Sequence, residues 1–67
     1  MYKQNLLKAK LIALSMPRSE LAGHLGISIT TLNYKLNGIQ EFKLSEIQKI
    51  CTILKLSKKE RDNIFFA

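Results

Sequence analysis

Apolar residues recur three or four positions apart in five successive stretches of the chain, which is the spacing of helices with one buried side. No stretch alternates apolar and polar residues between hairpin turns, so we expect no sheet. The pattern predicts an all-α protein, a compact five-helix bundle with short connections that forms a single domain over residues 1–67. The expected helices cover residues 4–14, 17–25, 29–36, 44–54 and 57–66.

Residues with known preferences for helix ends support these boundaries. Pro17 suits the first turn of the second helix, because the N–H that proline lacks would be unpaired there. Gly26 is expected to end that helix, since glycine is common directly after a last turn. Ser28 is a good N-cap for the third helix, and Asn37-Gly38 is expected to stop it.

The same spacing predicts which side chains form the core. Two helix starts carry the pattern of a capping box, Ser57 with Glu60 and Ser45 with Gln48, and the alternative for Ser45 is a place inside the first turn. The stripes of the first, second and fourth helices are expected to be buried, and their members are Leu7, Leu11, Leu14, Leu21, Leu25, Leu44, Ile47, Ile50, Cys51 and Leu54.

The third helix has an unusual outer side. Leu32 and Leu36 lie one turn apart and form an apolar stripe. Most of the other positions hold Thr, Asn and Tyr, which are mediocre helix formers. Exposed helix faces usually carry spaced Glu, Lys, Arg and Gln, yet no acidic residue occurs from Leu21 to Gln40. This composition indicates a surface that contacts a partner, and neutral surface residues stabilised only by packing are the alternative.

The link between the second and third helices consists of Gly26, Ile27 and Ser28 alone. Such a short link makes two helices cross, in the arrangement called helix-turn-helix. The small side chain of Ala22 suits the close approach, and Gly26 can take the positive φ angle of the turn. Apolar residues are expected to lock the corner, and they are Leu21, Leu25, Ile27 and Leu32.

With these residues in place, the chain resembles the Cro/repressor-type (XRE-like) helix-turn-helix family of phage and prophage regulators. The resemblance rests on ELAGHLGIS at positions 20–28, on TLNYKLNG at 31–38, and on EFKLSEIQKICTIL at 41–54, which is similar to the family's fourth helix. It extends from about Leu6 to Phe65. It implies a lambda-repressor-like fold in which the third helix lies in the major groove of DNA.

The resemblance also implies which residues touch DNA. Hydroxyl and carboxamide groups both donate and accept hydrogen bonds, as base edges require, and an isoleucine methyl suits the methyl group of thymine. The expected base-reading residues are Ser28, Ile29, Thr30, Asn33 and Tyr34. The expected phosphate contacts are Arg18, Lys35, Asn37 and Lys43.

Other interpretations of three positions stay open. Ile29 fits the buried stripe as well as a DNA contact. Tyr34 has the alternative of packing over the edge of its helix. Gly23, inside the second helix, either lets a neighbour approach or is simply tolerated.

The formal net charge of +6 favours an anionic partner, nucleic acid or a membrane surface. His24 is expected on the surface and Cys51 in the core, so we expect no metal, no cofactor and no enzyme. One cysteine allows no intrachain disulfide, and the start of the chain lacks the pattern of a signal peptide. These features, with the resemblance, indicate the cytoplasm of a bacterial host.

The sequence therefore predicts a double-stranded DNA-binding transcriptional regulator, a phage or prophage repressor of the Cro kind. It needs no membrane and no small-molecule substrate, and the family leads us to expect a homodimer on a two-fold operator. One alternative is a small protein-interaction module, such as an antirepressor or the partner of another regulator. Another is a membrane-surface binder that uses the basic first helix.

Of Phe65 and Phe66, one is expected to cap the core and the other to be exposed for a dimer or partner contact, unless the end frays.

Overall fold

Five α-helices form the protein in the computed structural model, which describes residues 2–66. They are α1 (Gln4–Ala13), α2 (Arg18–Leu25), α3 (Ile29–Leu36), α4 (Leu44–Ile53) and α5 (Lys58–Arg61), and a π-helical turn, η1 (Asp62–Phe66), continues α5. No strand occurs within these residues. The predicted all-α, five-helix class is confirmed.

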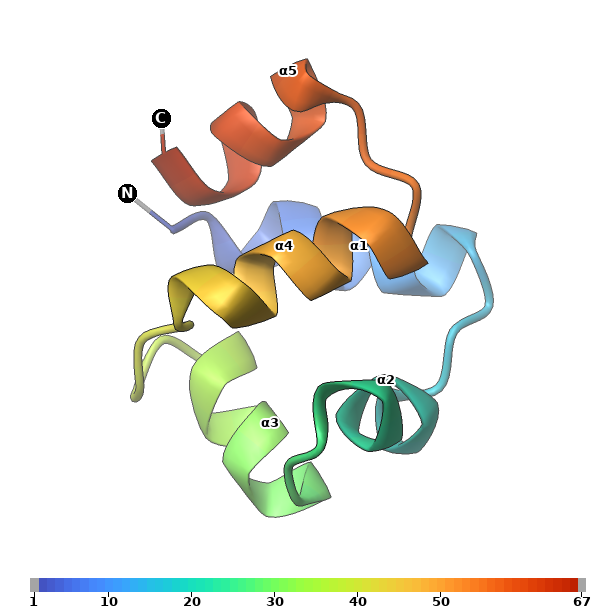
Figure 1. Ribbon diagram of the computed structural model, residues 1–67, viewed down its shortest axis with the longest axis vertical. Coiled ribbons are helices and arrows are strands. Elements are labelled where there is room, and N and C mark those ends of the chain that lie inside the picture. The colour runs from blue at the N-terminus through green and yellow to red at the C-terminus, as the bar shows by residue number, and fades with distance from the viewer. Residues whose placement is uncertain (1, 67) are drawn as a thin grey trace.

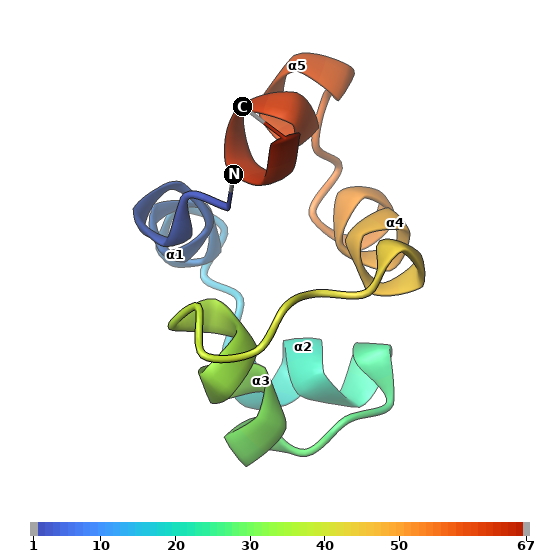
Figure 2. The ribbon, with the colours of Figure 1, turned by 90° about the vertical axis from the view of Figure 1, so that its left-hand side faces the viewer.

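The helices surround the core from four sides. In Figure 1, α2 and α3 lie at the bottom and α5 with η1 lies at the top, close to both chain ends. Figure 2 shows α1 and α4 on opposite sides between these two layers. This arrangement leaves the outer sides of α2 and α3 together on one end of the molecule.

Leucine and isoleucine side chains from α1 to α4 fill the core, and η1 closes it. Burying one such side chain stabilises the fold by about 1.5–3 kcal/mol. The core residues are Leu7, Leu11, Leu21, Ala22, Leu25, Leu32, Leu36, Ile47, Ile50, Leu54, Ile64 and Phe65. Phe65 is buried and Phe66 is exposed, as the sequence predicted for this pair.

Two predicted core residues are exposed, and one is only half-buried. Leu14 directly follows the last residue of α1, and the chain turns away at Ser15, whose φ is 53°. Leu44 is the first residue of α4 and is 63% exposed. Cys51 lies at the edge of the core. The predicted stripes were therefore wrong at Leu14 and Leu44, both at helix ends.

The helix ends follow local signals in most places. Gly26 takes φ 71° at the end of α2 and Gly38 takes φ 78° after α3, as expected for glycine. Ser57 Oγ accepts from the N–H of Glu60 at 3.1 Å, and the Ser57 N–H donates to Glu60 Oε1 at 3.0 Å, so this capping box is confirmed. Pro17 is the N-cap residue of α2, one position before its predicted place.

The second expected capping box does not form. α4 begins at Leu44, so Ser45 already lies inside the first turn and cannot cap it. Glu46 takes the role of Gln48 instead. Its Oε1 accepts a hydrogen bond from the backbone N–H of Lys43 at 2.8 Å.

A buried ion pair joins α3 to α4. Lys35 Nζ donates to Glu46 Oε1, and the two residues are only 5% and 6% exposed. The prediction that Lys35 contacts phosphate was therefore wrong, because its ammonium group is inside the protein. Lys35 lies three residues after Leu32 and next to Leu36, so it is on the buried side of α3, and its side chain points toward α4.

The ionisation of Glu46 depends on this pair. Burial alone would raise the pKa of the Glu46 carboxyl, but hydrogen bonds from Lys35 and from the Lys43 N–H, together with the charges of both lysines, hold it below its usual value. A carboxyl with a lowered pKa in the folded state stabilises the fold at neutral pH. This contribution is lost as the pH falls through that pKa.

We expect Glu46→Gln to lower the free energy of unfolding by about 3 kcal/mol, because Lys35 keeps a buried charge without a partner. The double variant Lys35→Met/Glu46→Gln should recover most of this loss, since it removes the charge and keeps the acceptor for the Lys43 N–H. Urea unfolding at neutral pH, followed by circular dichroism, measures both.

Glu60→Gln is the matched control. It breaks the half-exposed ion pair with Lys10, whose Nζ lies 2.7 Å from Glu60 Oε2, and keeps a side chain that suits a capping box. We expect little change in stability. Equal losses in Glu46→Gln and Glu60→Gln would contradict the special role of the buried pair.

Candidate nucleic-acid interface

The corner between α2 and α3 has the geometry that its short link predicts. Gly26 is in the left-handed conformation, and the Ile27 N–H donates to the Ala22 carbonyl at 3.1 Å. Leu21, Ala22, Leu25 and Leu32 are buried where the helices meet, and Ile27 packs against them. The two helices thus form a fixed unit at the lower end of the molecule (Figure 1).

α3 is divided into a buried side and an exposed side. Leu32 and Leu36 are completely buried. Ile29 is 47% exposed, which decides against a place for it in the core. Thr30 and Tyr34 are exposed one turn apart, and Asn33 lies beside them in a half-exposed position. The predicted base-reading residues of this helix are therefore together on one accessible surface.

Ser28 is the N-cap of α3, as predicted. Its Oγ accepts from the Thr31 N–H at 3.1 Å and donates to Thr31 Oγ1 at 2.9 Å. Since the hydroxyl hydrogen is already used, Ser28 is left with acceptor capacity toward a ligand.

Two side chains from other helices hold the amides of α3. Arg18 Nη1, at the start of α2, donates to Asn33 Oδ1 at 3.0 Å. Lys8 Nζ, on α1, donates to Asn37 Oδ1 at 2.7 Å and to Gln4 Oε1 at 3.0 Å. Sequence reasoning missed Lys8, because its place beside the end of α3 is a tertiary contact across 29 residues of chain.

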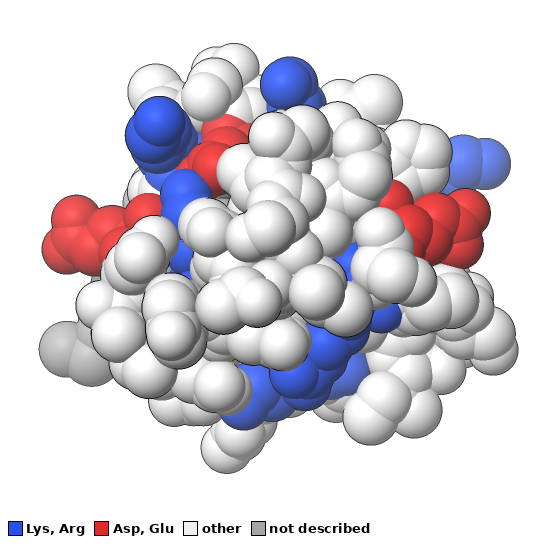
Figure 3. Space-filling model, turned by 90° about the horizontal axis from the view of Figure 1, so that it is seen from below, with Lys and Arg blue, Asp and Glu red and all other residues white. Residues whose placement is uncertain are grey.

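Charge is distributed unevenly over this end of the molecule. Seen from below, much of the middle of the surface is uncharged, a stretch of Lys and Arg lies in the lower part of the view with others scattered around the rim, and acidic groups lie on the left and right (Figure 3). Lys43, the N-cap of α4, is exposed, and so are Glu20 and Glu41, the acids on either side of the acid-free stretch. This pattern suits a polyanion that crosses a neutral central strip.

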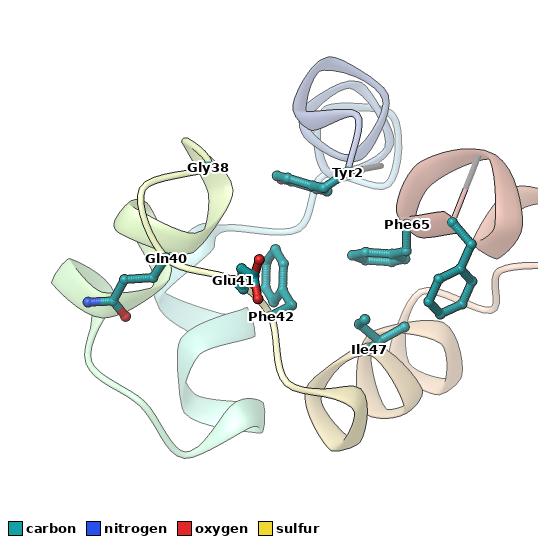
Figure 4. Close-up of a pocket in the computed structure, with 8 residues that line it drawn as sticks. Tyr2, Gly38, Gln40, Glu41, Phe42, Ile47 and Phe65 are labelled. Carbon is teal, nitrogen blue, oxygen red and sulfur yellow. The ribbon is translucent and has the colours of Figure 1, made fainter.

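Residues near both chain ends hold the carboxyl end of α3. Tyr2 Oη donates to the Leu36 carbonyl at 3.0 Å. The Tyr2 ring stacks on Phe65 at 5.8 Å between ring centres and meets the edge of Phe42 at 5.4 Å. Figure 4 shows these rings turned toward one another beside an open, mostly apolar pocket. The contacts fix the last turn of α3 and the loop that follows.

The burial of Tyr2 changes its acidity. Desolvation raises the pKa of the Tyr2 phenol to about 12, and the positive charge of Arg18 opposes part of this shift. The folded protein therefore keeps the phenol proton at a pH where the unfolded chain has lost it. The free energy of unfolding should fall as the pH rises above about 10.

No group of three potential metal ligands occurs within residues 2–66. His24 is exposed, with Nε2 4.0 Å from Glu20 Oε1. Burial raises the pKa of the Cys51 thiol, which disfavours the nucleophilic thiolate. In the same residues no helix is both long and apolar enough to span a bilayer.

Comparison with known families agrees with this geometry. A family model of the Cro/C1-type HTH DNA-binding domain matches residues 6–60. The matched region includes the whole of α2, α3 and α4. The chain matches no curated protein and no solved structure.

The environment of Tyr2 can be tested by alkaline titration, because the chain has two tyrosines and no tryptophan. In Tyr34→Phe the phenolate absorbance reports Tyr2 alone, and we expect its midpoint at about 12. Tyr2→Phe should lower the free energy of unfolding by about 1 kcal/mol, since it removes one hydrogen bond and keeps the ring. A midpoint near 10 while circular dichroism still shows a folded protein would contradict the buried hydrogen bond.

Proposed function

The chain belongs to the Cro/C1-type helix-turn-helix DNA-binding family, and from this premise we propose that it is a sequence-specific transcriptional regulator, a phage or prophage repressor of the Cro kind. In this proposal the protein occupies an operator in double-stranded DNA and blocks the polymerase. The observation that carries it is the outer side of α3, which is exposed, free of acidic residues and rich in hydrogen-bonding groups.

The proposed recognition helix is α3, placed in the major groove with its exposed side against the bases. The major groove is wide enough for an α-helix and presents a distinct set of donors and acceptors at each base pair. Thr30, Asn33 and Tyr34 would hydrogen-bond to base edges. Ser28 would act as an acceptor, and Ile29 would contact a thymine methyl.

Phosphate contacts would come from residues around α3. Arg18 and Lys43 are exposed cations, and the Asn37 amide nitrogen donates no hydrogen bond within residues 2–66. We add Lys8, since it is held beside Asn37. Cations spread over three elements fix the orientation of the protein on the duplex without reading its sequence.

The proposed roles of these residues differ in how their loss should affect binding. We expect Thr30→Ala and Tyr34→Ala to change the preferred sequence, with discrimination at the affected base pair falling about tenfold. Lys43→Ala should instead weaken binding to all sequences alike and reduce the salt dependence by about one phosphate contact. Selection of sites from random duplexes, followed by titration at two salt concentrations, separates the two effects.

Two results would count against this function. If no motif is enriched and binding is strongly salt-dependent, the charge attracts DNA but α3 does not read it. If Tyr34→Ala changes neither affinity nor preference, the orientation of α3 is wrong.

We further propose that the protein binds a two-fold operator as a homodimer through the surface around Phe66. Phe66 is 52% exposed and lines a pocket with Ile47, and the exposed Leu44 precedes Ile47 by one turn of α4. A standard interface buries about 800 Å² on each partner. A few exposed apolar side chains supply only part of this, so the dimer should be weak in solution and form on DNA.

Phe66→Glu should abolish the gain in affinity that a second half-site provides, and leave binding to a single half-site within about twofold. Leu6→Glu is the matched control. It changes the charge equally at a residue 45% exposed that lines a different pocket. Binding to duplexes with one and two half-sites measures both variants, and unchanged cooperativity in Phe66→Glu would contradict this interface.

A further inference from the structure

The carboxamide of Asn33 is held from outside its own helix, and this restricts what it can read. Arg18 Nη1 lies 3.0 Å from Asn33 Oδ1. A guanidinium group has only donors, so the amide atom that faces it must be the oxygen. The Nδ2 group of Asn33 is then turned away from Arg18, and it donates no hydrogen bond within residues 2–66.

Base edges differ in what they offer to such an amide. Guanine presents two adjacent acceptors, O6 and N7, in the major groove. Adenine presents one acceptor and one amino donor, and an unrestrained asparagine binds both with its oxygen and its nitrogen. With Arg18 on one lone pair of Oδ1, the amino group of adenine could reach only the other lone pair, and it would lie beside the positive charge of the guanidinium group. Guanine instead meets two N–H donors and a favourable charge.

We propose that Arg18 is a positioning residue that sets Asn33 to read guanine rather than adenine. This inference rests on the proposed function, because it assigns one base of the operator. Arg18 has further N–H groups for a phosphate, so orientation of Asn33 and attraction of the backbone are separate roles of one side chain.

A similar contact at the other end of α3 orients a second amide, that of Asn37, toward a phosphate instead of a base. Lys8, which also can only donate, holds Asn37 Oδ1 at 2.7 Å. Asn37 therefore presents its amide hydrogens, which suits a phosphate oxygen. The two amides of this side of α3 are both set as donors by cations from neighbouring helices.

The decisive experiment compares Arg18→Met with Lys43→Met, which removes the same charge from the residue that precedes α4. The operator position read by Asn33 is first identified as the base pair whose discrimination is lost in Asn33→Ala. Binding to duplexes that differ only at this pair is then measured by competition at low salt. Circular dichroism confirms that each variant is folded.

We expect the unmodified protein to prefer guanine at this position. In Arg18→Met the amino group of adenine would no longer meet a positive charge beside Oδ1, and the ratio of guanine to adenine affinity should fall about tenfold. Lys43→Met should weaken both duplexes equally and leave the ratio unchanged.

Other outcomes overturn the inference. The first is a preference of the unmodified protein for a base other than guanine. The second is a ratio of guanine to adenine affinity that Arg18→Met leaves unchanged, as Lys43→Met should. The third is an Asn33→Ala variant that loses discrimination at no base pair. In each of these cases an enriched operator motif would leave the proposed function standing. The absence of any enriched motif would overturn the proposed function, and the inference with it.

Discussion

The buried Glu46 carboxylate is the polar contact that joins α3 to the start of α4. One of its oxygens accepts hydrogen bonds from Lys35 on α3 and from the backbone N–H of Lys43 at the start of α4. It thereby fixes the two ends of the loop between these helices. A domain of 67 residues has a small core, so this buried ion pair adds a directional contact to the apolar packing that orients α3.

Because Lys35 is buried, the residues that would attract the DNA phosphates are different from those that would contact the bases. With this lysine turned inward, the exposed side of α3 carries hydroxyl, amide and methyl groups but no charge. Positive charge comes instead from Lys8, Arg18 and Lys43, which belong to α1, α2 and the start of α4. A neutral strip bordered by cations lets phosphates set the position of the helix, while short polar side chains discriminate between base edges.

Sequence reasoning succeeded where the physical signal is local. Gly26, Ser28 and the pair Ser57–Glu60 act within three or four residues, and the structure has each of them in its predicted role. It failed where the outcome depends on distant partners. Leu44 fits a helical stripe but is exposed at the helix start, and Lys35 has a buried partner that its own helix does not reveal. Lys8 became a candidate only when the fold brought α1 beside Asn37.

The short length of α3 explains why contacts at its ends matter for binding. An isolated helix of eight residues is not stable in water. Ser28 accepts from one backbone N–H in the first turn. Tyr2 donates to the Leu36 carbonyl in the last turn and packs on Phe65 from the other end of the chain. Loss of the contact between the chain ends would therefore loosen the last turn of α3. The free energy of folding and the free energy of DNA binding are thus coupled through this helix, because a side chain can discriminate between bases only while its backbone stays fixed.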